Sequence, residues 1–76
     1  MKTAKELFEE LGYKPFGKNG KYICYRKNMC FIEFDLNQKC VLTSKPNTTF
    51  NLITFDELQA INKQVDELGW LKEERK

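Results

Sequence analysis

The apolar positions near both ends of the chain recur at the three-to-four-residue spacing of an α-helix. This spacing predicts one helix over residues 4–11 and a second over residues 55–68. The first apolar stripe consists of Ala4, Leu7, Phe8 and Leu11. The second stripe, which we expect to be the buried face of its helix, consists of Leu58, Ile61, Val65 and Leu68. Each helix therefore presents one apolar face to a shared core.

The same start and stop signals bracket both predicted helices. A threonine followed three residues later by a glutamate opens each one, as Thr3 with Glu6 and as Thr54 with Glu57. This is the pattern of a capping box, in which each side chain bonds the other residue's backbone N–H. Gly12 and Gly69 follow the last helical residues, where a left-handed backbone ends a helix.

Between the helices, residues 13–44 alternate between apolar and polar positions as short β-strands do. The pair Asn19-Gly20 is typical of a two-residue hairpin turn. Further turns are expected at Lys27-Asn28 and Asn37-Gln38. The alternation sorts the side chains onto two faces. The more apolar face, on which we place the helices, holds Ile23, Tyr25, Cys30, Ile32, Phe34, Val41 and Thr43. The opposite face holds Tyr22, Cys24, Arg26, Phe31, Glu33, Asp35, Cys40 and Leu42.

The predicted fold is therefore a two-layer α+β domain in the order α-β-β-β-α, with both helices on one face of a small antiparallel sheet. An extra short strand at the start of the sheet, within Tyr13–Lys18, is left open, because Pro15 and Gly17 would restrict it to the sheet edge. Residues 1–71 form a single domain, and residues 72–76 are expected to be a charged tail. A chain of 76 residues is near the size at which one core suffices.

Charge is distributed unevenly along the chain. Residues 13–50 carry seven basic and two acidic side chains, whereas the segments on either side are net acidic. No apolar run reaches the roughly 20 residues that a membrane span needs. No secretion signal is recognisable. Three cysteines in a chain that lacks a secretion signal indicate reduced, buried thiols. We therefore expect a cytoplasmic protein of a bacterial host with no membrane partner.

The residues that usually carry catalysis are sparse. The chain has no histidine, which removes the commonest general base and metal ligand. The spacing of Cys24, Cys30 and Cys40 matches no zinc motif. Glu33 and Asp35 could form an acid/base pair, but carboxylates two apart on a strand are typical of a solvated sheet face. We expect no catalytic residue, no cofactor and no metal, and hence no enzyme.

Surface recognition is the remaining class of function. The polar face of the predicted sheet combines aromatic side chains with a rim of basic ones, which suits an acidic protein or a single-stranded nucleic acid. The alternative is that a loop or Trp70 covers these aromatics as ordinary core. Besides Leu42, the candidate partner-binding surface consists of Lys21, Tyr22, Arg26, Lys27, Phe31 and Lys39.

The order α-β-β-β-α is similar to that of a double-stranded RNA-binding domain. That resemblance implies nucleic-acid binding through the basic centre. Such domains grip phosphates with lysines at the start of the second helix. This chain instead has Asp56 and Glu57 there, which would repel phosphate, so nucleic-acid binding is the second hypothesis.

The two ends of the chain resemble small uncharacterised proteins of phages and prophages of low-GC Gram-positive bacteria. The resemblance covers residues 1–13 (MKTAKELFEELGY) and residues 53–70 (ITFDELQAINKQVDELGW). It implies a phage-associated accessory protein without catalytic residues. The leading hypothesis is therefore a protein that binds a host protein, such as a component of antiviral defence, and blocks it.

Overall fold

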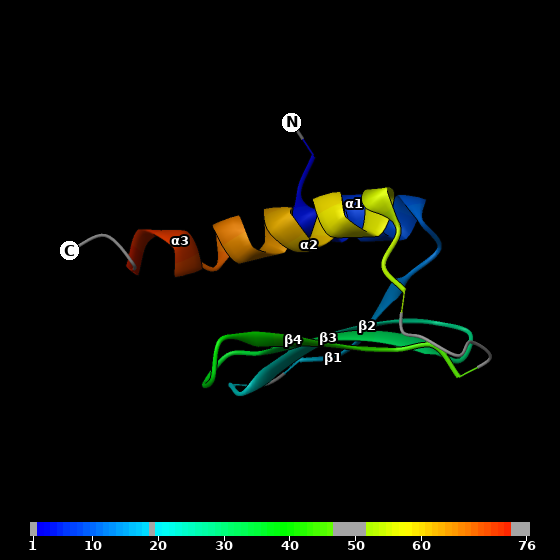
Figure 1. Cartoon of the computed structure of the whole chain (residues 1–76), viewed down its shortest axis with the longest axis horizontal. Coiled ribbons are helices and arrows are strands. Elements are labelled where there is room, and N and C mark those ends of the chain that lie inside the picture. Colours follow the sequence, from blue (N-terminus) through cyan, green and yellow to red (C-terminus); the bar gives the residue numbers. More distant parts are fainter. Residues whose placement is uncertain (1, 19, 47–51, 74–76) are drawn as a thin grey trace.

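Four antiparallel strands form one sheet, and the helices lie together on one side of it (Figure 1). The computed structural model describes residues 2–18, 20–46 and 52–73. Its elements are α1 (Ala4–Glu10), β1 (Lys14–Lys18), β2 (Tyr22–Lys27), β3 (Cys30–Asp35), β4 (Cys40–Ser44), α2 (Phe55–Glu67) and α3 (Trp70–Glu73). The sheet order is β1-β2-β3-β4. The predicted two-layer α+β class is confirmed, with one strand more than α-β-β-β-α because the short strand that had been left open forms as β1.

Both helices begin and end as their signals predict. The Thr3 side chain accepts a 3.2 Å hydrogen bond from the Glu6 backbone N–H, and the Glu6 carboxylate accepts one of 2.9 Å in return. Thr54 and Glu57 make the same exchange at 3.1 and 3.0 Å. Gly12 and Gly69 have φ values of +95° and +77°, in the left-handed region that glycine adopts without strain.

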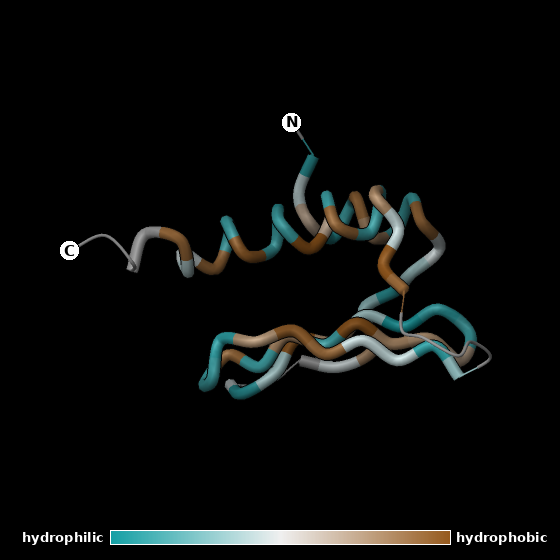
Figure 2. Tube along the Cα trace, in the orientation of Figure 1, coloured by the Kyte–Doolittle hydropathy of each residue, from teal (hydrophilic) through white to brown (hydrophobic). Residues whose placement is uncertain are grey.

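The strand register confirms the predicted faces. Across β2 and β3, Ile23 pairs with Phe34 and Tyr25 pairs with Ile32, which sets these apolar side chains on the face toward the helices. Figure 2 shows hydrophobic stretches in the strands of the sheet, below the helices. The β1–β2 pairing is irregular between Pro15 and Gly17. Because residue 19 is not among the described residues, the predicted Asn19-Gly20 turn lies outside the described part of the chain.

An aromatic cluster forms the centre of the core between the two layers. The Phe8 ring of α1 stacks on the Tyr25 ring of β2, with ring centroids 4.1 Å apart. Phe34 and Tyr13 meet the Phe8 ring edge-on, with centroids at 6.2 and 5.9 Å. Burial of such side chains is the main stabilising contribution in a domain of this size. The core therefore joins α1 to the middle of the sheet.

The buried face of α2 differs from the predicted apolar stripe. Leu58, expected in the core, is 44% exposed, whereas Glu57 and Gln64 are each only 6% exposed. Two tyrosines account for this orientation of the helix. The Tyr13 hydroxyl donates to the Glu57 carboxylate at 2.8 Å, and the Tyr25 hydroxyl donates to the Gln64 side-chain oxygen at 2.7 Å. Hydrogen bonds of this kind allow polar side chains to occupy a core that apolar spacing alone assigns to leucine.

The chain stays helical beyond the expected end of the domain. α3 includes residues 72 and 73, which the sequence predicts to belong to the charged tail. Trp70 packs against the core, and its ring centroid lies 6.4 Å from that of Phe34. Over the described residues, no helix is long and apolar enough to cross a membrane.

Candidate functional site

The face of the sheet turned away from the helices is the candidate site. Its side chains follow the strand register in three cross-strand rows, which are Tyr22–Asp35–Cys40, Cys24–Glu33–Leu42 and Arg26–Phe31–Ser44. α1, α2 and α3 all lie on the other side of the sheet (Figure 1). Leu42 is 54% exposed and Tyr22 is 38% exposed, so large apolar side chains remain accessible on this face.

Three side chains form a compact cluster at the β2–β3 turn end of this face. The Arg26 guanidinium carbon lies 4.8 Å from the Phe16 ring centroid and 5.4 Å from that of Phe31. The two rings meet edge-on with centroids 5.9 Å apart. The Arg26 Nε–H also donates a 2.9 Å hydrogen bond to the Asn28 carbonyl, which orients the guanidinium. Each cation–π contact at an accessible site contributes about 0.5–1 kcal/mol. We call Phe16, Arg26 and Phe31 the arginine–phenylalanine cluster.

Phe16 was missing from the predicted surface. It lies in β1 at the irregularity between Pro15 and Gly17, where one residue has no direct partner on β2. A bulge of this kind redirects a side chain. Phe16 is thereby brought against Phe31 of β3 while it remains 56% exposed. The Pro-x-Gly spacing was visible in the sequence, but it served only to mark a weak edge strand.

The six predicted surface residues divide into three groups. Arg26 and Phe31 belong to the arginine–phenylalanine cluster. Lys21, Tyr22 and Lys39 lie at the opposite end of the sheet, where the backbone N–H of Leu36 in the β3–β4 turn bonds the Lys21 carbonyl at 2.9 Å. Lys27 is not part of the open face, because its Nζ lies 5.5 Å from the Tyr13 ring centroid on the side of the helices. Basic charge on the open face is therefore less concentrated than the sequence predicts.

The two carboxylates of this face have separate surroundings. The Asp35 Oδ1 accepts hydrogen bonds of 3.0 Å from the backbone N–H groups of both Asn37 and Gln38, so this side chain shapes the β3–β4 turn. Glu33 lies in the central row beside Cys24 and Leu42. Burial, and secondly the Glu33 charge, raise the pKa of the Cys24 thiol. A thiol with a raised pKa is a poor nucleophile at neutral pH.

The cysteines are distributed over the fold. Cys24 is buried and Cys30 is half-buried, but Cys40 is exposed, which corrects the expectation that all three are buried. Cys24 pairs with Glu33 and Cys30 with Lys27, so the two cysteines are not cross-strand neighbours. Within the described ranges, no group of three His, Cys, Asp or Glu side chains is placed to hold a metal ion.

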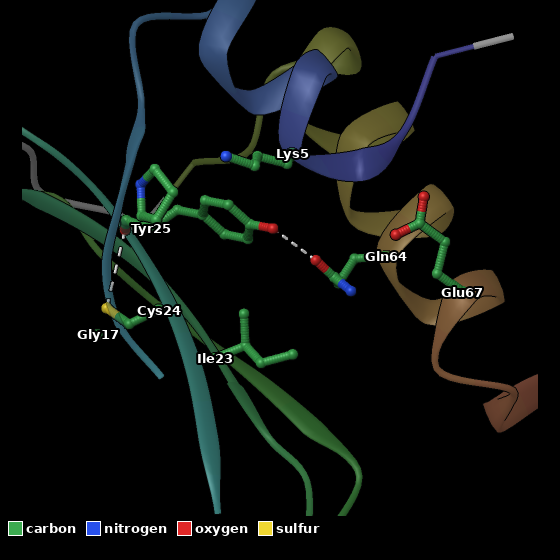
Figure 3. A pocket seen from close by; sticks show the side chains of 8 residues that line it. Lys5, Gly17, Ile23, Cys24, Tyr25, Gln64 and Glu67 are labelled. Atoms are coloured by element: carbon green, nitrogen blue, oxygen red, sulfur yellow. Dashed lines mark hydrogen bonds between the residues drawn. The ribbon is translucent and has the colours of Figure 1, made fainter. Parts of the chain in front are cut away.

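A concave region lies between the helices and strands β1 and β2 (Figure 3). This cavity of about 370 Å³ is lined by Lys5, Pro15, Gly17, Ile23, Cys24, Tyr25, Gln64 and Glu67. The Tyr25–Gln64 hydrogen bond crosses it, with Lys5 and Glu67 on either side (Figure 3). The Glu67 Oε2 already accepts a 2.8 Å hydrogen bond from the Ala4 N–H. The hydrogen bonds of Tyr25, Gln64 and Glu67 therefore tie α1, α2 and β2 together. The polar groups of this cavity have a structural role.

Glu57 is the centre of a buried polar cluster at the start of α2. Its Oε1 accepts from Lys45 Nζ at 2.6 Å and from the Thr54 N–H at 3.0 Å, and its Oε2 accepts from the Tyr13 hydroxyl at 2.8 Å. Burial alone would raise the pKa of this carboxyl group, but hydrogen bonds from Lys45, Thr54 and Tyr13 hold it below its ordinary value. With its oxygens already engaged, the carboxylate serves to hold the layers together.

A scan of known protein families, a search of curated proteins and a search of solved structures each find no match to this chain. The geometry of the open face is therefore the basis for a proposed function.

Proposed function

We propose that this protein acts without catalysis, by binding a host protein through the open face of its sheet. The observation that carries the proposal is the accessible arginine–phenylalanine cluster, in which Phe16 is 56% exposed beside Arg26 and Phe31. Aromatic side chains and arginine are enriched at the energetically important centres of protein interfaces. Leu42 extends the apolar area toward β4. A surface that mixes apolar and charged side chains in this way favours a protein partner.

The distribution of charge favours a protein over a nucleic acid. Glu33 and Asp35 lie on the same face as Arg26 and would repel phosphates there. Lys27 is turned to the other side, and Lys45 is paired with Glu57 at 2.6 Å. The start of α2 also carries Asp56 and Glu57, where an RNA-binding helix would need lysines. Nucleic-acid binding is therefore a competing outcome for the experiment to exclude.

The geometry of the remaining polar groups supports a non-catalytic role. Asp35 is committed to a turn and Glu57 to a buried cluster, and the pKa of the Cys24 thiol is raised by burial. The accessible Cys40 and half-buried Cys30 suit a reducing compartment, in keeping with a cytoplasmic site of action. The resemblance of both chain ends to phage and prophage proteins motivates the choice of a host factor, including one of antiviral defence.

Affinity capture from the lysate of a low-GC Gram-positive host tests the proposal. Immobilised protein is expected to enrich the same host protein repeatedly, with the interaction retained after nuclease treatment. Gel-shift titration with RNA and DNA at low salt provides the contrasting measurement, since a phosphate-driven interaction is strongest there. Tight nucleic-acid binding together with loss of the captured protein after nuclease treatment would overturn the proposal.

A further inference from the structure

The two edges of the sheet are protected to different degrees. β1 contains Pro15, which has no N–H to donate, and an irregular register up to Gly17. Both features discourage the pairing of another strand. β4 pairs regularly with β3 along its length, and its five residues (CVLTS) include no proline, glycine or charged side chain. Among the described residues, β4 is therefore an edge strand that lacks the proline and the irregular register found in β1.

One flank of α2 is apolar and accessible. Ala60, which is fully buried, and Glu67, which accepts from the Ala4 N–H, mark the flank turned toward α1. At 3.6 residues per turn, Leu58 and Val65 occupy the opposite flank. Leu58 is 44% exposed, and Val65 packs against the core with one side but is only half-buried, although both belong to the apolar stripe of this helix. The sequence therefore makes this flank of α2 apolar, as for a buried surface, but the single chain does not cover it fully.

This flank lies on the same side of the molecule as the β4 edge. α1 contacts β1, and its Phe8 ring stacks on Tyr25 of β2. Lys45, directly after β4, reaches Glu57 in the first turn of α2 at 2.6 Å. Figure 1 shows α2 alongside α1 and running along the sheet. With α1 above the β1 side, the α2 flank that faces away from α1 is on the β4 side.

We propose that the β4 edge and the Leu58–Val65 flank together form the interface with a second copy of this chain. Two β4 strands would pair antiparallel about a two-fold axis and continue the sheet across both copies. Centred on Leu42, this pairing sets Leu42 opposite the second copy's Leu42, and Val41 opposite its Thr43. The same axis brings the two exposed α2 flanks toward each other on the helical side of the sheet. A single two-fold axis would thus bury both the β4 edge and the Leu58–Val65 flank.

Charge and area both favour a second copy as the occupant. β4 itself carries no charge, and the Lys45 side chain, only 14% exposed, is neutralised by Glu57. Antiparallel pairing centred on Leu42 sets Lys45 beside Lys39 of the second copy, and the ion pair of Lys45 with Glu57 limits the repulsion there. A strand of about 17 Å and a helix of about 20 Å, stacked in two layers, would bury on the order of 500 Å² per copy. That total of roughly 1,000 Å² is at the lower limit for a specific interface, so the dimer should be reversible at micromolar concentrations.

Sedimentation velocity over a concentration series tests the proposal directly. Between about 1 µM and about 1 mM the protein is expected to pass from monomer to dimer. Over the same range, amide hydrogen exchange in β4 should slow while that in β1 stays constant. A monomer throughout the series, or a dimer without added protection of β4, would overturn the proposal. Protection of β4 only by an added extended peptide would identify a foreign strand instead.

A matched pair of variants on α2 locates the interface. Leu58→Lys sets a charge on the exposed flank and should weaken dimerisation about tenfold or more, which corresponds to about 1.4 kcal/mol. Gln59→Lys adds the same charge to the next residue of the helix, which is exposed and lies outside the flank, and should leave dimerisation unchanged. Circular dichroism and melting temperature confirm folding of both. Equal dimerisation of the wild type and Leu58→Lys, or equal loss in both variants, would refute this interface.

Discussion

The Tyr13 hydroxyl donates a 2.8 Å hydrogen bond to the carboxylate of Glu57, which lies 44 residues further along the chain. This contact joins the segment between α1 and β1 to the first turn of α2. Both residues are almost fully buried, at 1% and 6% exposure. The hydrogen bond therefore helps to fix the rotation of α2 about its own axis. That rotation determines which flank of the helix stays accessible.

Removing this hydroxyl should weaken the fold without destroying it. Tyr13→Phe leaves the aromatic packing against Phe8 in place but deprives Glu57 of one buried donor. We expect a loss of about 1–2 kcal/mol in the free energy of unfolding, because a hydrogen bond to a charged group is lost. Urea denaturation measures this. Met29→Leu, at an exposed position in the β2–β3 turn, is the control and should change stability by less than about 0.5 kcal/mol. Equal effects in both variants would contradict the structural role of the contact.

Acid should destabilise the protein partly through Glu57. Its pKa is lowered on folding from an ordinary value of 4.5, so the folded state prefers the charged carboxylate. The stability that this group contributes is present above pH 4.5 and is lost as the pH falls through the lowered value. Glu57→Gln should therefore be less stable at neutral pH and show a flatter decline of stability in acid. Parallel pH profiles for the two proteins would contradict this assignment.

Gly69 ends α2 with a φ of +77°, and an added Cβ would meet no atom within 4 Å. The cost of Gly69→Ala is therefore backbone strain alone, which we expect to lower the free energy of unfolding by about 1 kcal/mol. Gly17→Ala is a matched control, because an added Cβ there also meets nothing within 4 Å and its φ is not left-handed. A melting temperature for Gly69→Ala equal to that of Gly17→Ala would show that the strain is absent.

Local signals in the sequence were sufficient for much of the fold. The Thr-x-x-Glu and Gly signals gave both helices, because capping depends on residues that are close in the chain. The alternation of apolar and polar residues predicted the two faces of the sheet, because it too depends on residues that are close in the chain. Leu58 was misplaced because apolar spacing does not reveal that tyrosine hydroxyls from β2 and from before β1 bring Glu57 and Gln64 into the core.

The candidate site was predicted only in part. Arg26 and Phe31 were correctly placed on one face by alternation. Phe16 was missed because its position depends on an irregularity in the β1–β2 register, which the sequence does not specify. Lys27 could have been assigned correctly, since it is two residues from the inward-facing Tyr25 on the same strand. Its charge led to its inclusion in the basic rim.

Binding through the open face of the sheet is tested most directly by comparing two phenylalanine variants in the lysate capture. Phe16→Asp introduces a charge into the arginine–phenylalanine cluster. Phe55→Asp introduces the same charge at a phenylalanine that is more exposed, at 71%, in the first turn of α2. We predict that Phe16→Asp lowers the yield of the captured host protein at least about tenfold, since hot-spot truncations cost about 2 kcal/mol or more. Phe55→Asp should retain the wild-type yield. Undiminished capture by a folded Phe16→Asp variant would contradict binding through this face.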